Sequence, residues 1–295
     1  MRLLPLRVVL VATDLADSSL SAIEAGRDLA DAADADLHIV NVAGTSVVDA
    51  TSVHEMLEHA GIGSDDAFVH VVAGDPSLAI GKLADLIAAD VIVLGPHHEQ
   101  RGGSANGPLS ADTAAGVVTN SAAPCLVAHR LQLPLERVVV AFDLSETSRG
   151  ALIVGLSWAS ALRSARARAG NAVNVTALYV TDPKGGTDHL SLVADSIERQ
   201  LDELRESAGS WANVIVESDM IAGENVAGSV EHYAAEHRAG LIVMGTRGLG
   251  IDSIGRIGSV AATVARRSEV PTLLVPPAIW LELGQVRPHR RARSS

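Results

Sequence analysis

The sequence repeats itself once, and this repeat limits the folds that the chain can adopt. Residues 9–19 (VLVATDLADSS) match residues 138–148 (VVVAFDLSETS), and each is an apolar run that ends in an aspartate before Ser/Thr-rich helix-start residues. Further matches follow in the same order, pairing 73–76 with 222–225, 89–95 with 239–245, and 123–128 with 270–275. Self-similarity in a fixed order indicates that one fold occurs twice. We therefore expect two homologous domains, 1–130 and 136–277, a short linker at 131–135, and a C-terminal segment at 278–295 with a basic tail.

Short apolar runs and alanine-rich helical stretches alternate through both repeats. Two further strand-like runs per repeat, 37–42 with 175–180 and 68–72 with 214–218, complete five predicted strands in each half. Aromatic residues are only 2% of the chain, so Val, Ile, Leu and Ala must build the core, as in sheets that helices bury on both faces. The pattern predicts an α/β fold of two tandem, doubly wound, five-stranded parallel sheets, with ligands at the carboxyl ends of the strands.

Composition excludes several partners and locations. The formal net charge is −12, and the predicted domains hold no cluster of Lys and Arg wide enough for a duplex, so we expect no nucleic-acid partner. No apolar stretch approaches the roughly 20 residues that span a bilayer, so we expect no membrane partner. A lone cysteine, Cys125, and the lack of a secretory leader favour a reducing compartment, most simply the cytoplasm.

A glycine-rich segment follows the predicted fourth strand of the second repeat. Gly245, Gly248, Gly258 and Ser259 form the pattern Gly-x2-Gly-x9-Gly-Ser directly before a helical stretch. Glycine lets the backbone approach phosphate oxygens, and the N–H groups at a helix start favour an anion. Asp143 ends the first strand of the same repeat, beside this loop. The position and spacing predict an adenine-nucleotide site, with ATP as the ligand. Arg247 and Arg256 either offset phosphate charge or are solvated.

On these residues the chain resembles the universal stress proteins in their tandem two-domain form, over nearly its whole length. The resemblance implies a Rossmann-like, adenine nucleotide alpha hydrolase-like fold and ATP bound through the glycine pattern. It implies that Ala141, Phe142 and Val180 border the adenine and that Met244, Arg247 and Val260 flank the phosphates. The site set is then Ala141, Phe142, Asp143, Val180, Met244, Gly245, Arg247, Gly248, Gly258, Ser259 and Val260. It also implies that the domains associate through their fifth strands, 125–129 and 272–275, as an intrachain pseudo-dimer. A homodimer of chains stays open.

The first repeat departs from the glycine pattern. Counting forward from Gly95 as from Gly245, His98 replaces the second glycine. Counting back from Pro124 as from Pro271, Ala111 replaces the third glycine and Asp112 the serine. A carboxylate at this position repels phosphate, so we expect the first half not to bind ATP, although Gly102, Gly103 and Gly107 leave room for a different anion loop. The adjacent histidines at 97 and 98 predict a solvated loop rather than a metal site, and Cys125 a buried, inert thiol.

The sequence favours a binding module over an enzyme. The phosphate-transfer loop Gly-x4-Gly-Lys-Ser/Thr is absent, and no lysine lies between Gly245 and Ser259. Asp143 and Asp252 are candidate ligands for Mg²⁺, but neither is placed to activate a water. We expect a nucleotide-responsive regulatory or stress-response protein. The alternative is a slow ATP-hydrolysing enzyme that uses the same site.

Overall fold

The computed structural model confirms the predicted alternation of strands and helices. It describes residues 6–16, 19–43, 50–63, 65–95, 111–128, 130–162, 172–184, 187–208, 213–248 and 257–277. The first half contains β1 (Val8–Thr13), α1 (Leu20–Ala33), β2 (Asp36–Ala43), α2 (Ala50–His59), β3 (Phe68–Ala73), α3 (Pro76–Leu86), β4 (Val91–Leu94), α4 (Ala111–Asn120) and β5 (Cys125–Val127). The second half contains β6 (Arg137–Ala141), α5 (Glu146–Ala161), β7 (Val173–Thr181), α6 (Thr187–Ala208), β8 (Val214–Ala222), α7 (Val226–Glu236), β9 (Leu241–Gly245), α8 (Ser259–Arg267) and β10 (Thr272–Val275).

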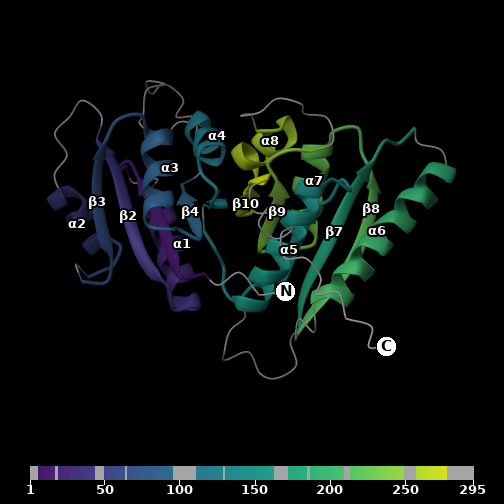
Figure 1. Ribbon diagram of the computed structural model, residues 1–295, viewed down its shortest axis with the longest axis horizontal. Coiled ribbons are helices and arrows are strands. Elements are labelled where there is room, and N and C mark those ends of the chain that lie inside the picture. Colours follow the sequence, from purple (N-terminus) through teal and green to yellow (C-terminus); the bar gives the residue numbers. More distant parts are fainter. Residues whose placement is uncertain are drawn as a thin grey trace, which may run out of the picture.

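The ten strands of the described residues form one sheet, in the order β3-β2-β1-β4-β5-β10-β9-β6-β7-β8. Each half is thus doubly wound, and strand order reverses between β1 and β4 and between β6 and β9. The halves meet where β5 and β10 pair antiparallel, with Thr272 opposite Val127 and Leu274 opposite Cys125. This pairing confirms the predicted association through the fifth strands, and Figure 1 shows the halves side by side about it. The other strand pairs are parallel.

Two buried layers enclose the sheet. Side chains from α1, α2, α5 and α6 cover one face, and this core runs without a break from the first half into the second. Side chains from α3, α4, α7 and α8 cover the other face. Because both faces are covered, the central strands are apolar along their whole length: β4 and β9 read VIVL and LIVMG.

A glycine lies where the first helix of each half crosses the first strand. A Cβ added at Gly26 would lie 2.1 Å from Val11 Cγ2, and one at Gly155 would lie 3.1 Å from Val140 Cγ2. The repeat aligns Gly26 with Gly155 and Val11 with Val140. The close helix-to-strand contact is therefore a feature of both halves, and it is tighter in the first.

We expect Gly26→Ala to lower the free energy of unfolding by about 1–3 kcal/mol, because the new methyl group must displace Val11 or the helix. Urea denaturation measures this loss. Gly155→Ala, where the gap is wider, should cost less, and the double variant Gly26→Ala/Val11→Ala should recover most of the stability. An equal loss in all three variants would show that the contact with Val11 is not the cause.

Candidate functional site

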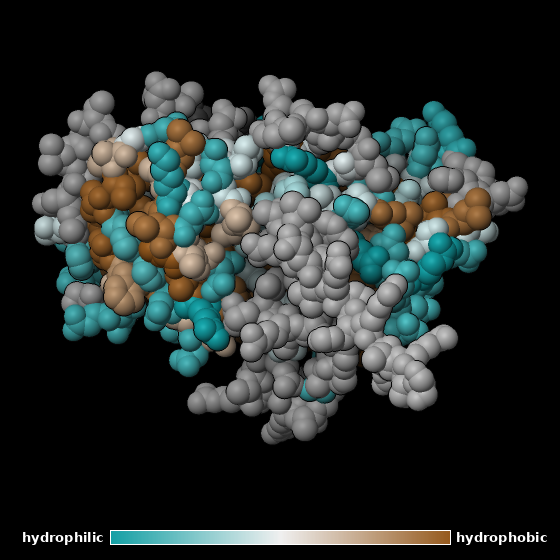
Figure 2. Space-filling view, in the orientation of Figure 1, coloured by the Kyte–Doolittle hydropathy of each residue, from teal (hydrophilic) through white to brown (hydrophobic). Residues whose placement is uncertain are grey.

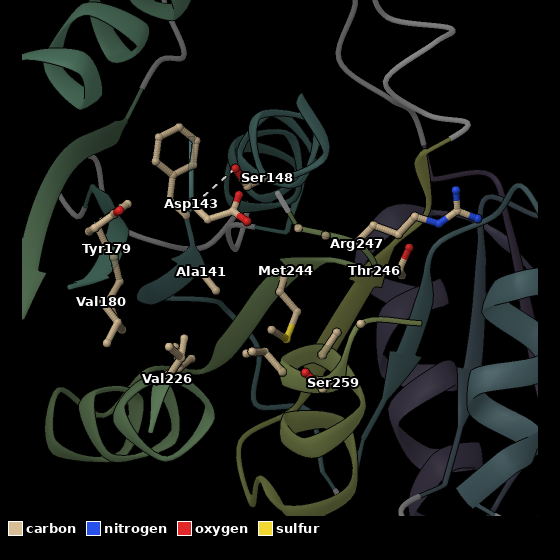
Figure 3. Close-up of a pocket in the computed structure, with 18 residues that line it drawn as sticks. Ala141, Asp143, Ser148, Tyr179, Val180, Val226, Met244, Thr246, Arg247 and Ser259 are labelled. Atoms are coloured by element: carbon tan, nitrogen blue, oxygen red, sulfur yellow. Dashed lines mark hydrogen bonds between the residues drawn. The ribbon is translucent and has the colours of Figure 1, made fainter. Parts of the chain in front are cut away.

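A cavity of about 420 Å³ opens at the carboxyl ends of β6, β7 and β9, where strand order reverses in the second half (Figure 3). Its volume falls in the range of about 300–1,000 Å³ that is typical of small-molecule sites. The 18 lining residues are Ala141, Phe142, Asp143, Ser148, Leu178, Tyr179, Val180, Val226, Val230, Met244, Gly245, Thr246, Arg247, Gly248, Gly258, Ser259, Val260 and Ala261.

Every residue of the predicted site set lies on this cavity, although the residues come from separate parts of the chain. Sequence reasoning missed Ser148, Leu178, Tyr179, Val226, Val230, Thr246 and Ala261. Three of these carried a usable signal. Leu178 lies two residues before Val180 on the same strand, so both side chains point to the same face. Val226 and Val230 lie one turn apart at the start of α7 and share one side of that helix.

One end of the cavity is apolar. Its lining includes the side chains of Ala141 and Met244, which lie close to each other, and those of Val180 and Val226 (Figure 3). Met244 is 3% exposed and belongs to the buried core on this face of the sheet. These four residues come from β6, β9, β7 and α7, so the apolar end is held by the sheet and one packed helix.

The other end of the cavity is formed by the start of α8 and the loop after β9. The N-cap of α8 is Gly258, whose N–H donates to the carbonyl of Thr246 at 2.7 Å. The first N–H groups of an α-helix lack intrahelical acceptors and carry partial positive charge. The first turn of α8 contains no acidic residue, and Ser259 adds a hydroxyl group at this position. This end therefore favours an anion.

Gly245 and Gly248 let the loop after β9 approach the turn between β6 and α5. A Cβ at Gly248 would lie 2.6 Å from Asp143 Oδ2, and one at Gly245 would lie 3.0 Å from the main-chain carbon of Thr147. The hydroxyl of Thr147 donates to the main-chain oxygen of Arg247 and ties the two segments together. Gly245 thus faces the backbone of Thr147 and Gly248 faces the carboxylate of Asp143, and both close contacts are present independently of any ligand.

Asp143 organises the turn between β6 and α5. Its Oδ1 accepts hydrogen bonds from the N–H and the hydroxyl of Ser145, at 3.1 and 2.5 Å. Ser145 in turn caps α5 by accepting from the N–H of Ser148. Asp14 has a related role in the first half, where its Oδ1 accepts from the N–H of Ala16 at 3.0 Å and from the hydroxyl of Ser19 at 2.5 Å. The aspartate after each first strand thus stabilises its own turn, and in the second half it also faces the cavity.

Arg247 lines the cavity, but its guanidinium extends away from Ala141 and Met244 (Figure 3). Arg256 and Asp252 lie outside the described residues, so the predictions that they offset phosphate charge or bind Mg²⁺ stay untested. Within the described ranges no three His, Cys, Asp or Glu side chains gather as a metal site would require.

The first half differs at the equivalent place. Ala111 begins α4 and Asp112 lies in its first turn, each as far from Pro124 as Gly258 and Ser259 are from Pro271. His98, its neighbour at 97 and the glycines at 102, 103 and 107 lie outside the described residues. Cys125 is fully buried, as predicted, and burial raises the pKa of its thiol to about 12.

Comparison with known proteins supports the fold. The model of the universal stress protein family matches residues 5–129 and 134–276. A universal stress protein from Archaeoglobus fulgidus DSM 4304 is similar in structure, with 21% identity and a TM-score of 0.60 over 91% of this chain and 98% of that protein. A functionally unknown protein from Pseudomonas aeruginosa PAO1 has 16% identity and a TM-score of 0.59, over 96% and 98% of the two chains. No curated protein matches the sequence. No helix in the described parts of the chain is long and apolar enough to cross a membrane.

Proposed function

The chain belongs to the universal stress protein family, and we propose that it binds ATP in its second half only, as a nucleotide-responsive regulatory protein. One observation carries this proposal. The residues predicted from the glycine pattern and from the family resemblance all line one cavity, which has an apolar end and an anion-favouring end. ATP has two matching parts: its adenine ring suits the apolar end, and its anionic phosphates suit the anion-favouring end.

The residues present fit such a ligand. Val180, Val226 and Met244 would contact the faces of the adenine ring, because an aromatic base buries best against apolar side chains. This role for Met244 differs from the one that the family resemblance implies, beside the phosphates, because its buried side chain lies at the apolar end of the cavity. Gly248, Gly258 and Ser259 would hold the phosphates through main-chain N–H groups and a hydroxyl group. In the first half, Asp112 would repel phosphate from the start of α4, which supports binding in the second half only.

We propose that this site binds ATP without turning it over at a significant rate. Among the described residues that line the cavity, Asp143 is the only carboxylate, and neither lysine nor histidine is present. Asp143 also accepts two hydrogen bonds from Ser145, which hold its side chain in the turn. If the nucleotide arrives with Mg²⁺, Asp143 is the described lining carboxylate that would hold the ion. We place the protein in the cytoplasm, where the lone buried thiol of Cys125 stays reduced.

The alternative function is slow ATP hydrolysis at the same site, with Asp143 as the residue that contacts the attacking water. Release of ADP over hours from the purified protein distinguishes hydrolysis from binding alone. Steady release that Asp143→Asn abolishes would establish the enzyme.

Gly248→Ala tests the proposed site. We expect it to weaken ATP binding about tenfold, equivalent to about 1.4 kcal/mol, because the added Cβ must move Asp143 or the loop. Calorimetric titration gives the affinity. Gly240→Ala is the matched control: this glycine lies at the other end of β9, where an added Cβ would meet nothing closer than 3.4 Å. Equal affinity in both variants and the wild type would refute this placement of the phosphates.

A further inference from the structure

The two edges of the ten-stranded sheet differ in how well they are protected against pairing with a strand of another chain. A strand at the edge of a sheet presents unpaired N–H and C=O groups, and natural proteins shield such edges with charges, proline or covering elements. The sheet ends in β3 on one side and in β8 on the other. Because the repeat makes these strands equivalent, their differences show which edge is available for pairing.

The β8 edge is protected. Its strand carries Glu217 and Asp219, and the guanidinium of Arg205 on α6 donates to the main-chain carbonyl of Val216 at 3.0 Å. The hydroxyl of Ser218 donates to Glu198 on the same helix at 2.6 Å. The helix beside this edge is 22 residues long. A second chain would have to displace these charged side chains to pair with β8.

The β3 edge has none of these features in the described residues. Its sequence is FVHVVA, without a charged residue or a proline, and α2, which packs against it, has only 10 residues. Phe68 is 57% exposed and Val71 is 37% exposed. Because side chains alternate along a strand, these two lie on opposite faces, so apolar surface borders the edge on both sides.

The ring of His38 borders β3, and a further apolar side chain is exposed on α3. The ring of His38 on β2 stacks on Phe68 with 4.7 Å between centroids, and its Nδ1 lies 2.9 Å from Nε2 of His70. Burial lowers the pKa of both imidazoles below the usual value, so both are neutral at pH 7. Leu86 at the end of α3 is 81% exposed. Figure 2 shows hydrophobic residues gathered over the end of the molecule where Figure 1 places β2, β3 and α3.

We propose that β3 is a pairing edge that binds β3 of a second copy of this chain, antiparallel and about a two-fold axis. A second copy offers an identical free edge, and two-fold pairing makes the same contacts on both chains. The chain carries a net charge of −12, so two copies approach with least repulsion at an uncharged strand. Further copies do not add to this dimer, because the β8 edges at its two ends are protected against pairing. The same kind of antiparallel pairing between strands of the two halves occurs inside the chain, between β5 and β10.

Sedimentation velocity over about a hundredfold range of protein concentration tests this proposal, because self-association follows mass action. We expect the wild type to shift from monomer to dimer as its concentration rises, and Val71→Lys to need at least about tenfold more protein for the same shift. Ile215→Lys on β8 is the matched control, since this residue is 46% exposed on the other edge. It should associate as the wild type does.

If circular dichroism shows that Val71→Lys is unfolded, Phe68→Lys on the opposite face of the same strand replaces it, with the same expected result. Three outcomes would overturn the proposal. They are a wild type that stays monomeric throughout, a dimer that neither β3 variant weakens, and a dimer that Ile215→Lys weakens as much as the β3 variants do.

Discussion

Ser259→Asp is expected to lower the affinity for ATP at least about 100-fold while the protein stays folded. The substitution places a carboxylate in the first turn of α8, at the end of the cavity proposed to hold the phosphates. Two unit charges about 4 Å apart repel by about 4 kcal/mol at an effective dielectric constant of 20, and each 1.4 kcal/mol is a factor of ten in affinity. The expected loss is therefore large even if solvent screens part of the repulsion.

The same substitution should leave stability unchanged or slightly raise it. An acidic residue near a helix N-terminus contributes about 0.3–1 kcal/mol, because it complements the helix dipole. Binding and stability thus change in opposite directions, which separates loss of the site from loss of the fold. Ser259→Asn, similar in shape but uncharged, is the control and should cost less than tenfold in affinity. Calorimetry and thermal melting measure the two effects. Wild-type affinity in Ser259→Asp would show that phosphate binds elsewhere.

Trp158→Ala is expected to lower the free energy of unfolding by about 3–5 kcal/mol, the usual cost of truncating a buried aromatic side chain. Trp158 is 2% exposed and lies on α5, whose side chains are buried on nearly every side. It belongs to the core that runs through both halves, so the loss should weaken the whole molecule. Urea denaturation gives the value.

Leu86→Ala is the matched control for this prediction. Leu86 is 81% exposed, so its truncation should change stability by less than about 0.5 kcal/mol. A loss below about 1 kcal/mol in Trp158→Ala would contradict the described packing of α5.

The fold could be predicted from the sequence because the repeat and the alternation of strands and helices agree with each other. Residues 9–19 and 138–148 show the same strand, turn and helix start, and the structure forms all three in both halves. The ends of individual strands were predicted less accurately than their number and order. The run 214–218 was predicted for a strand that extends to Ala222, because the polar residues of an edge strand interrupt the apolar pattern.

The site was predicted only in part, for a physical reason. Gly245, Gly248 and Asp143 could be found from spacing and position, because glycines and an aspartate at the carboxyl ends of strands mark the turns where a doubly wound sheet binds its ligands. The spacing of Val226 and Val230 indicates that they share one side of a helix, but it does not show that this side faces the cavity rather than the core. The contact between Gly26 and Val11 was missed as well, because a close approach of helix and strand leaves no signal in one sequence.

Calorimetric titration of the purified chain with ATP, followed by measurement of ADP in the same sample, tests the central claim most directly. The structure and the first half's Asp112 predict one site per chain and negligible ADP after several hours. Two sites per chain, or none, would contradict ATP binding in the second half only, and sustained release of ADP would contradict a binding protein without turnover.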